Sequence, residues 1–234
     1  TDGVIAVSEA VRQDVIKRYS YTPNKVIVIY DGIDETKFYR PLSVSKMHDA
    51  RSPWRIGGAG RLVPQKGFDI LIKALAKLPA EIKWRCQIAG AGPLQDELAS
   101  LIKNLNLEHK VSLIGVHSDL RSFFSRLDIF VIPSCWEGLG LVALEAGAAG
   151  VPVIASATGG LQEIIQHRYS GFLVDNLQPE TLAQALEYIF IGDGAKELSI
   201  WAKNWQKEVM SHFTITQTAC HYEEYYERII HKKN

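Results

Sequence analysis

Residues 128–146 read DIFVIPSCWEGLGLVALEA. The segment begins with a short, β-branched apolar run that ends at Pro133, passes through a turn with Gly138 and Gly140, and continues as a helix from about Leu141. A strand, a glycine-containing turn and a helix in immediate succession form the repeating unit of a parallel α/β sheet. This segment therefore predicts the fold class.

The same succession repeats on both sides of this segment. Short apolar runs bounded by Gly, Pro or Asp occupy residues 54–60, 84–89, 111–115, 128–133 and 151–155. Apolar residues between them recur at helical spacing, at Phe68, Leu71, Ile72, Leu75 and Leu78 and at Leu94, Leu98, Leu101, Ile102 and Leu105. Strand then helix, five times over, predicts a doubly wound, Rossmann-like parallel sheet that binds ligands at the carboxyl ends of its strands.

The flanking segments extend this pattern at both ends. Strands are predicted at residues 3–7, 25–30 and 171–174, a polar loop at 42–53, and helices at about 179–191, 195–210 and 215–231. We expect one domain over residues 1–234, with leading strands and a linker in about 1–40 and a C-terminal helix and tail in about 213–234. The chain starts at Thr1 and runs at once into a strand, so we expect it to be a fragment of a longer protein.

Composition excludes several classes of protein. The 234 residues carry 26 basic and 26 acidic side chains, and this zero net charge disfavours a nucleic-acid partner. No apolar stretch is long enough for a transmembrane segment, and no signal-peptide pattern is present. The three cysteines, Cys86, Cys135 and Cys220, are far apart in sequence, which fits a cytoplasmic protein. Cys135 has no histidine within a few residues, so we expect it to be a core residue. Paired histidines and Asp-x-Asp are missing, so no catalytic metal is expected.

The quoted segment also predicts a ligand site. Glycines before a helix let a ligand approach the backbone, and the free N–H groups of the first helical turn favour an anion such as a phosphate. Glu137 precedes this turn and Glu145 lies one turn inside the helix, so the pair can bind opposite ends of an elongated ligand. Since the run from Leu141 to Ile154 has no other charge, Glu145 is expected to be buried and to accept hydrogen bonds from ribose hydroxyls. The alternative is that Glu137 is a neighbour of the helix N-cap and Glu145 a solvated residue of the helix.

A second group of candidate residues follows the first core strand. Gly60, Arg61 and Lys66 place two cations beside glycines, which suits a diphosphate, although the segment lacks the Walker A pattern. Residues 90–93 (Gly-Ala-Gly-Pro) predict a tight turn beside the pocket, and residues 158–160 (Thr-Gly-Gly) a further loop. Asp31 and Asp34 most simply serve a turn.

Together these residues resemble a known family. The Glu137–Glu145 spacing, Gly60-Arg61, Lys66-Gly67, residues 150–153 (Gly-Val-Pro-Val) and residues 159–163 (Gly-Gly-Leu-Gln-Glu) are similar to the C-terminal half of a GT-B retaining glycosyltransferase of family 4, glycosyltransferases group 1. The resemblance covers nearly the whole chain. It implies that this chain is the half that binds a nucleotide-sugar donor, and that an absent N-terminal half supplies the acceptor site.

The resemblance also implies roles for particular residues. Arg61 and Lys66 would hold the donor diphosphate, Glu145 the ribose, and Glu137 the transferred sugar beside its anomeric carbon, so that Glu137, Arg61 and Lys66 form the catalytic set. The remaining donor-binding positions, most of them through the backbone, would be Gly60, Ile114, Val116, Gly138, Leu139, Gly140, Leu141 and Val142. The family is similar in retaining the anomeric configuration and in needing neither metal nor cofactor. Asp31, Leu139 and Ala148 depart from the usual Asn, Phe and Met.

Several points stay open from the sequence. The donor is a UDP-, GDP- or ADP-sugar, and the acceptor a glycan, a lipid or a small molecule. The isolated chain is expected to bind donor without transferring sugar. Membrane association of the full-length protein is left open beside the cytoplasmic location. Two alternatives are one half of a sugar-nucleotide epimerase, disfavoured by the scarcity of histidines near the motifs, and a nicotinamide-dependent dehydrogenase domain, disfavoured by the lack of GxGxxG.

Overall fold

A six-stranded parallel sheet forms the centre of the protein. The computed structural model describes residues 3–42 and 52–231, so most of the loop predicted at 42–53 lies outside the described residues. The strand order is β5-β4-β3-β6-β7-β8, and every neighbouring pair is parallel. The bounds are β3 (Trp54–Ala59), β4 (Trp84–Ala89), β5 (Val111–Leu113), β6 (Ile129–Ile132), β7 (Val153–Ser156) and β8 (Phe172–Val174). The predicted doubly wound α/β fold is therefore confirmed.

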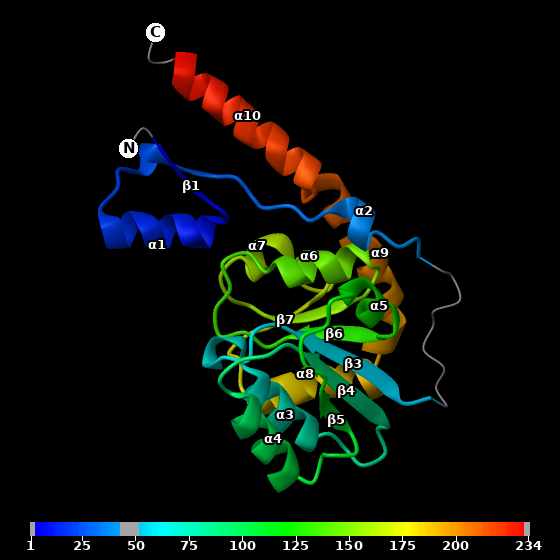
Figure 1. Ribbon diagram of the computed structural model, residues 1–234. Coiled ribbons are helices and arrows are strands. Elements are labelled where there is room, and N and C mark those ends of the chain that lie inside the picture. Colours follow the sequence, from blue (N-terminus) through cyan, green and yellow to red (C-terminus); the bar gives the residue numbers. More distant parts are fainter. Residues whose placement is uncertain (1–2, 43–51, 232–234) are drawn as a thin grey trace.

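Helices cover both faces of this sheet, as Figure 1 shows. One face carries α3 (Phe68–Ala76), α4 (Gln95–Asn104) and α8 (Pro179–Ile191), and the other α5 (Leu120–Ser125), α6 (Leu141–Ala148) and α7 (Leu161–Ile164). Helix α9 (Gly194–His212) contacts both α6 and α8 and so joins the two layers. Strands β6 and β7 are completely buried between these layers, which explains why they are apolar runs without polar alternation, whereas β4 near the edge alternates buried residues with the exposed Arg85 and Gln87.

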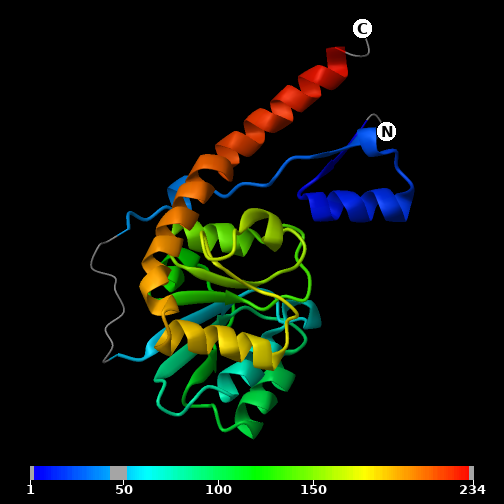
Figure 2. The same cartoon turned by 180° about the vertical axis from the view of Figure 1, so that it is seen from behind.

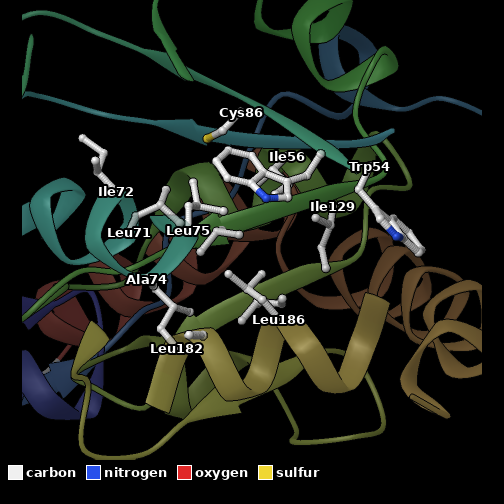
Figure 3. Packing of buried hydrophobic residues seen from close by; sticks show 14 of the residues in the cluster. Trp54, Ile56, Leu71, Ile72, Ala74, Leu75, Cys86, Ile129, Leu182 and Leu186 are labelled. Atoms are coloured by element: carbon white, nitrogen blue, oxygen red, sulfur yellow. The ribbon is translucent and has the colours of Figure 1, made fainter. Parts of the chain in front are cut away.

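Side chains of successive strand residues enter two separate cores. Ile129 and Val131 of β6 pack in the core beneath α3 and α8, whereas Phe130 and Ile132 pack in the core beneath α5 and α6. Figure 3 shows the first core, where Leu71 and Leu75 of α3 lie opposite side chains of the sheet and of α8. This alternation follows from the two-residue period of a strand.

The predicted long helices are present, while several shorter ones were missed. Helix α8 and α10 (Ile215–His231) begin and end where the sequence predicted, and α9 is slightly longer than predicted. Helix α1 (Glu9–Tyr19) was not predicted, because it buries none of its residues and so has no pronounced apolar face. The short α2 (Glu35–Phe38), α5 and α7 and the 3₁₀ turns η1 (Pro23–Lys25) and η2 (Pro64–Lys66) are too brief to show a helical period.

The first residues form a unit of their own, which we call the N-terminal βαβ unit (residues 4–28). Strands β1 (Val4–Ala6) and β2 (Val26–Val28) pair in parallel with each other, and α1 connects them. The two predicted strands are thus present but form a sheet separate from the six-stranded one. Helix α10 leaves the main body and extends towards this unit (Figures 1 and 2), and the hydroxyl of Thr218 donates to the carbonyl of Tyr30, at 3.0 Å.

Candidate active site

A pocket of about 530 Å³ lies at the carboxyl ends of β3 and β6. The chain order of the strands reverses between these two neighbours, and such a switch point is where open α/β sheets bind ligands. Ten of the predicted site residues line the pocket: Gly60, Arg61, Lys66, Val116, Glu137, Leu139, Gly140, Leu141, Val142 and Glu145. Two others, Ile114 and Gly138, are not among its lining residues.

Glu137 is a buried carboxylate that accepts hydrogen bonds from two side chains of the protein. Its side chain is buried, and its Oε1 accepts hydrogen bonds from Lys66 Nζ at 2.5 Å and from the Ser134 hydroxyl at 2.7 Å. Ser134 is itself buried, and its carbonyl accepts from the hydroxyl of Ser156. The sequence predicted Lys66 on a diphosphate and Glu137 at the sugar; the structure pairs them directly. A buried carboxylate needs such partners to offset its desolvation, and η2 brings the lysine within reach.

The start of α6 offers free backbone donors to the pocket. Gly140 adopts φ 95°, a left-handed conformation suited to glycine, and no side chain caps the helix. Among residues 3–42 and 52–231, none accepts a hydrogen bond from the backbone N–H of Gly138, Leu139 or Gly140. Because Leu139 to Val142 line the pocket, this end of the helix presents N–H groups to it, an arrangement that suits an anion.

Arg61 is the exposed cation of the site. It follows Gly60 directly after β3 and makes no ion pair with any residue in the described part of the chain. Its guanidinium is therefore available to a ligand anion without first breaking a contact within the protein.

Glu145 is the second carboxylate of the pocket and lies on α6. Its partial burial raises its pKa to about 7, and the positive charge of Lys37 moderates that rise. The sequence predicted this residue to be buried, and the structure leaves it half-buried beside the pocket. A desolvated carboxylate of this kind gains from donors such as ligand hydroxyls.

The pocket also contains residues that the sequence analysis missed. Asp31, which was assigned to a turn, lines the pocket, and burial raises the pKa of its carboxyl group. His117 lines it too, and its Nε2 is buried without a hydrogen-bond partner among the described residues. Val7 of the N-terminal βαβ unit is a third such residue. Val7 and Asp31 come from segments remote in sequence from the glycine motifs, whereas His117 directly follows Val116, a predicted site residue, and was itself not singled out.

The loop after β5 is arranged differently from the prediction. The N–H of Ile114 donates to the carbonyl of Ile88 at 2.9 Å, and the Gly115 carbonyl accepts from Gly90 at 2.7 Å. These backbone groups are engaged in the sheet, so Ile114 does not offer its N–H to a ligand. Val116, which is 79% exposed and lines the pocket, is the residue of this loop whose backbone can face a base.

Two further expectations concern cysteines and metals. Cys135 is exposed, in contrast to the predicted core position, because the residues before Glu137 form an outer turn whose Cys135 N–H donates to Gln65. Within the described residues, no three His, Cys, Asp or Glu side chains cluster so as to hold a metal ion. Metal independence itself stays a prediction. Among the same residues no helix combines the length and apolar character needed to cross a bilayer.

The six-stranded Rossmann-like sheet and the pocket at its switch point define one half of a GT-B glycosyltransferase fold. The family model "Glycosyl transferases group 1" matches residues 49–208, and the chain belongs to this family.

Relatives and solved structures agree with this assignment. An uncharacterized glycosyltransferase of Methanocaldococcus jannaschii is 34% identical over 220 residues, which are 90% of this chain and 56% of that protein. The structure of HepE from Anabaena in complex with UDP and glucose superposes with a TM-score of 0.86 at 26% identity, over 97% of this chain and 64% of HepE. The C-terminal domain of a group 1 glycosyltransferase from Francisella tularensis gives a TM-score of 0.67 at 30% identity, over 79% of this chain and 100% of that domain. The chain thus spans about half the length of the curated relatives it matches.

Proposed function

We propose that this chain is the donor-binding half of a retaining glycosyltransferase that moves a sugar from a nucleoside diphosphate sugar to an acceptor, without metal or cofactor. The observation that carries the proposal is one pocket that combines Arg61, Lys66, Glu137 and Glu145 with the uncapped start of α6. The UDP in the HepE complex, on a closely similar fold, supports a nucleotide ligand.

The diphosphate binds between Arg61 and the start of α6. Arg61 presents a planar fork of donors, and the N–H groups of Gly140 to Val142 add the partial positive charge of a helix N-terminus. When the bond between sugar and diphosphate breaks, its electron pair moves onto the diphosphate. Cationic groups fixed at this place lower the barrier because they stabilise the charge as it develops.

The sugar lies beside Glu137. Lys66 and Ser134 both donate to Oε1, and no described residue donates to Oε2, so that oxygen remains available to the sugar. A carboxylate there stabilises the positive charge that the sugar ring acquires. Lys66, which lines the pocket together with Glu137, neutralises this carboxylate before the donor binds and can turn to the diphosphate as charge builds up.

The nucleoside end of the donor lies towards Glu145 and Val116. Ribose hydroxyls donate to the carboxylate of Glu145, which supplies the partners that its desolvated position lacks. The backbone at Val116 faces the base.

Transfer itself belongs to the longer protein. The acceptor, a glycan, a lipid or a small molecule, binds outside the residues described here, because a site with one wall cannot orient an acceptor or exclude water. We therefore propose that this chain alone binds donor but transfers no sugar.

A nucleotide screen tests the proposal. UDP, GDP and ADP are each titrated into the chain by calorimetry, and thermal unfolding is followed with and without each nucleotide. The preferred nucleotide, at about 100 times its Kd, should add about 2.7 kcal/mol to the free energy of unfolding, and NAD should add nothing. Binding of NAD in preference to all three nucleotides contradicts the proposed donor site.

A further inference from the structure

The loop from Glu137 to Gly140 is held by two segments that the proposed mechanism does not use. On one side, the buried hydroxyl of Ser8 donates to the carbonyl of Gly138 at 2.5 Å and accepts from the N–H of Val11 at 3.1 Å. Ser8 is thus the N-cap of α1 and at the same time a partner of the site loop.

On the other side, the glycines of the Thr158–Gly160 segment lie against the same loop. The N–H of Gly160 donates to the carbonyl of Glu137 at 3.0 Å. A Cβ at Gly159 would lie 2.0 Å from the carbonyl oxygen of Glu137, and one at Gly160 2.3 Å from that of Gly138. Only glycines allow this close approach of two backbones.

Glu163 fastens these two segments to each other. Its Oε2 accepts from the backbone N–H of Glu9 at 2.8 Å and its Oε1 from that of Ala10 at 2.7 Å, so the carboxylate caps the first turn of α1. The hydroxyl of Tyr30 adds a third bond to Oε2, at 3.1 Å. These contacts join residues more than 130 positions apart in sequence, and they connect α1 and Tyr30 to α7, the helix that begins directly after Gly160.

Peptide geometry shows what this connection does. In a trans peptide the C=O and the N–H of the same unit point in opposite directions. The carbonyl of Glu137 points towards Gly160 and that of Gly138 towards Ser8, so the N–H of Gly138 points away from Gly160 and the N–H of Leu139 points away from Ser8. Those two N–H groups have no acceptor among the described residues, and Leu139 lines the pocket.

We propose that Ser8 and Glu163 are positioning residues, which hold the Gly138 and Leu139 N–H groups in the orientation that receives the donor sugar. The inference rests on the proposed function of the pocket. It makes the N-terminal βαβ unit a part of the donor site, because a shift of α1 moves Ser8 and so turns the peptide that follows Gly138. Arg61 and the start of α6, which hold the diphosphate, are not connected to Ser8 or Glu163 by any described hydrogen bond.

The test compares the affinities for UDP and UDP-glucose in the full 234-residue chain. Glu163→Gln and Ser8→Ala should each weaken UDP-glucose binding about tenfold while changing UDP binding by less than about twofold. Ser8→Thr keeps the hydroxyl and should restore the wild-type ratio of the two affinities. Glu97→Gln, an exposed carboxylate in the first turn of α4, is the matched control and should leave both affinities unchanged. If one of the two variants fails to fold, the ratio of the affinities for UDP and UDP-glucose is measured on the other.

The possible results distinguish a failure of the positioning role from a failure of the proposed function. Equal losses for UDP and UDP-glucose, or no loss for either, show that Ser8 and Glu163 only stabilise the fold, and they overturn the positioning role. Equal affinities of the wild type for both ligands also overturn it, while the nucleotide site stands. A wild type that binds neither ligand, nor the GDP and ADP pairs, overturns the proposed function and this inference with it.

Discussion

Replacing Glu145 with glutamine should stabilise the protein at alkaline pH while weakening its affinity for nucleosides. Burial raises the pKa of Glu145 from 4.5 to about 7, which means that the folded protein disfavours the charged form. Below pH 4.5, the pKa of the group in the unfolded chain, the carboxyl group is neutral in both the folded and the unfolded state, so its burial costs no stability. Between pH 4.5 and about 7 the folded state holds more protons than the unfolded state, so stability falls as pH rises, and above 7 the full penalty remains.

The size of this effect follows from the shift. At about 1.4 kcal/mol for each pKa unit, the penalty has an upper limit of about 3.4 kcal/mol. Glu145 is only half-buried, so solvent screening reduces the expected gain of Glu145→Gln at pH 8 to about 1–2 kcal/mol.

Urea unfolding of wild type and Glu145→Gln at pH 8 and at about pH 4.5 measures this difference. The variant should be more stable at pH 8, and the two midpoints should converge at the acid end. Asp175→Asn, a change at an exposed carboxylate, is the control and should shift stability little at either pH. A Glu145→Gln variant with the same stability advantage at both pH values refutes the assigned desolvation, and a less stable variant at pH 8 refutes its sign.

The same site gives three further predictions. Uridine should bind the wild type more tightly at pH 8 than at pH 5, because ribose hydroxyls favour the ionised Glu145; Glu145→Gln should remove this pH dependence, and calorimetry at both pH values would detect it. Arg61→Ala should weaken UDP binding about tenfold or more and leave uridine binding nearly unchanged, whereas equal losses would place Arg61 away from the diphosphate. In the full-length enzyme, Glu137→Gln should lower kcat far more than it changes the affinity for donor; parallel losses in steady-state and binding measurements would make Glu137 a binding residue only.

The sequence was sufficient to predict the central sheet and the charged set of the pocket. Apolar strands such as residues 129–132 and 153–156 are buried on both faces, so their composition alone marks them. Arg61 and Glu137 lie in the loops that follow β3 and β6, and parallel strands bring their carboxyl ends to one edge, which is why residues far apart in sequence could be assigned to one site.

The parts that were missed depend on contacts between distant segments. Asp31 and His117 belong to the pocket only because β2 and the loop after β5 are packed beside it, and neither lies in a local motif. The direct pairing of Lys66 with Glu137 results from the course of η2, a three-residue turn without a sequence period. The roles of Ser8 and Glu163 could not be predicted, because the contacts of Ser8 with Gly138 and of Glu163 with α1 arise from the placement of the N-terminal βαβ unit on the larger body.

The position of the pocket on the sheet bears on how enzymes of this kind can diversify. The groups assigned to bond breaking follow β3 and β6, the two central strands, whereas Val116 follows β5 at one edge. Under the proposed function, a substitution in this edge loop would alter the surroundings of the nucleobase and leave the central strands, with the charged groups that follow them, unchanged.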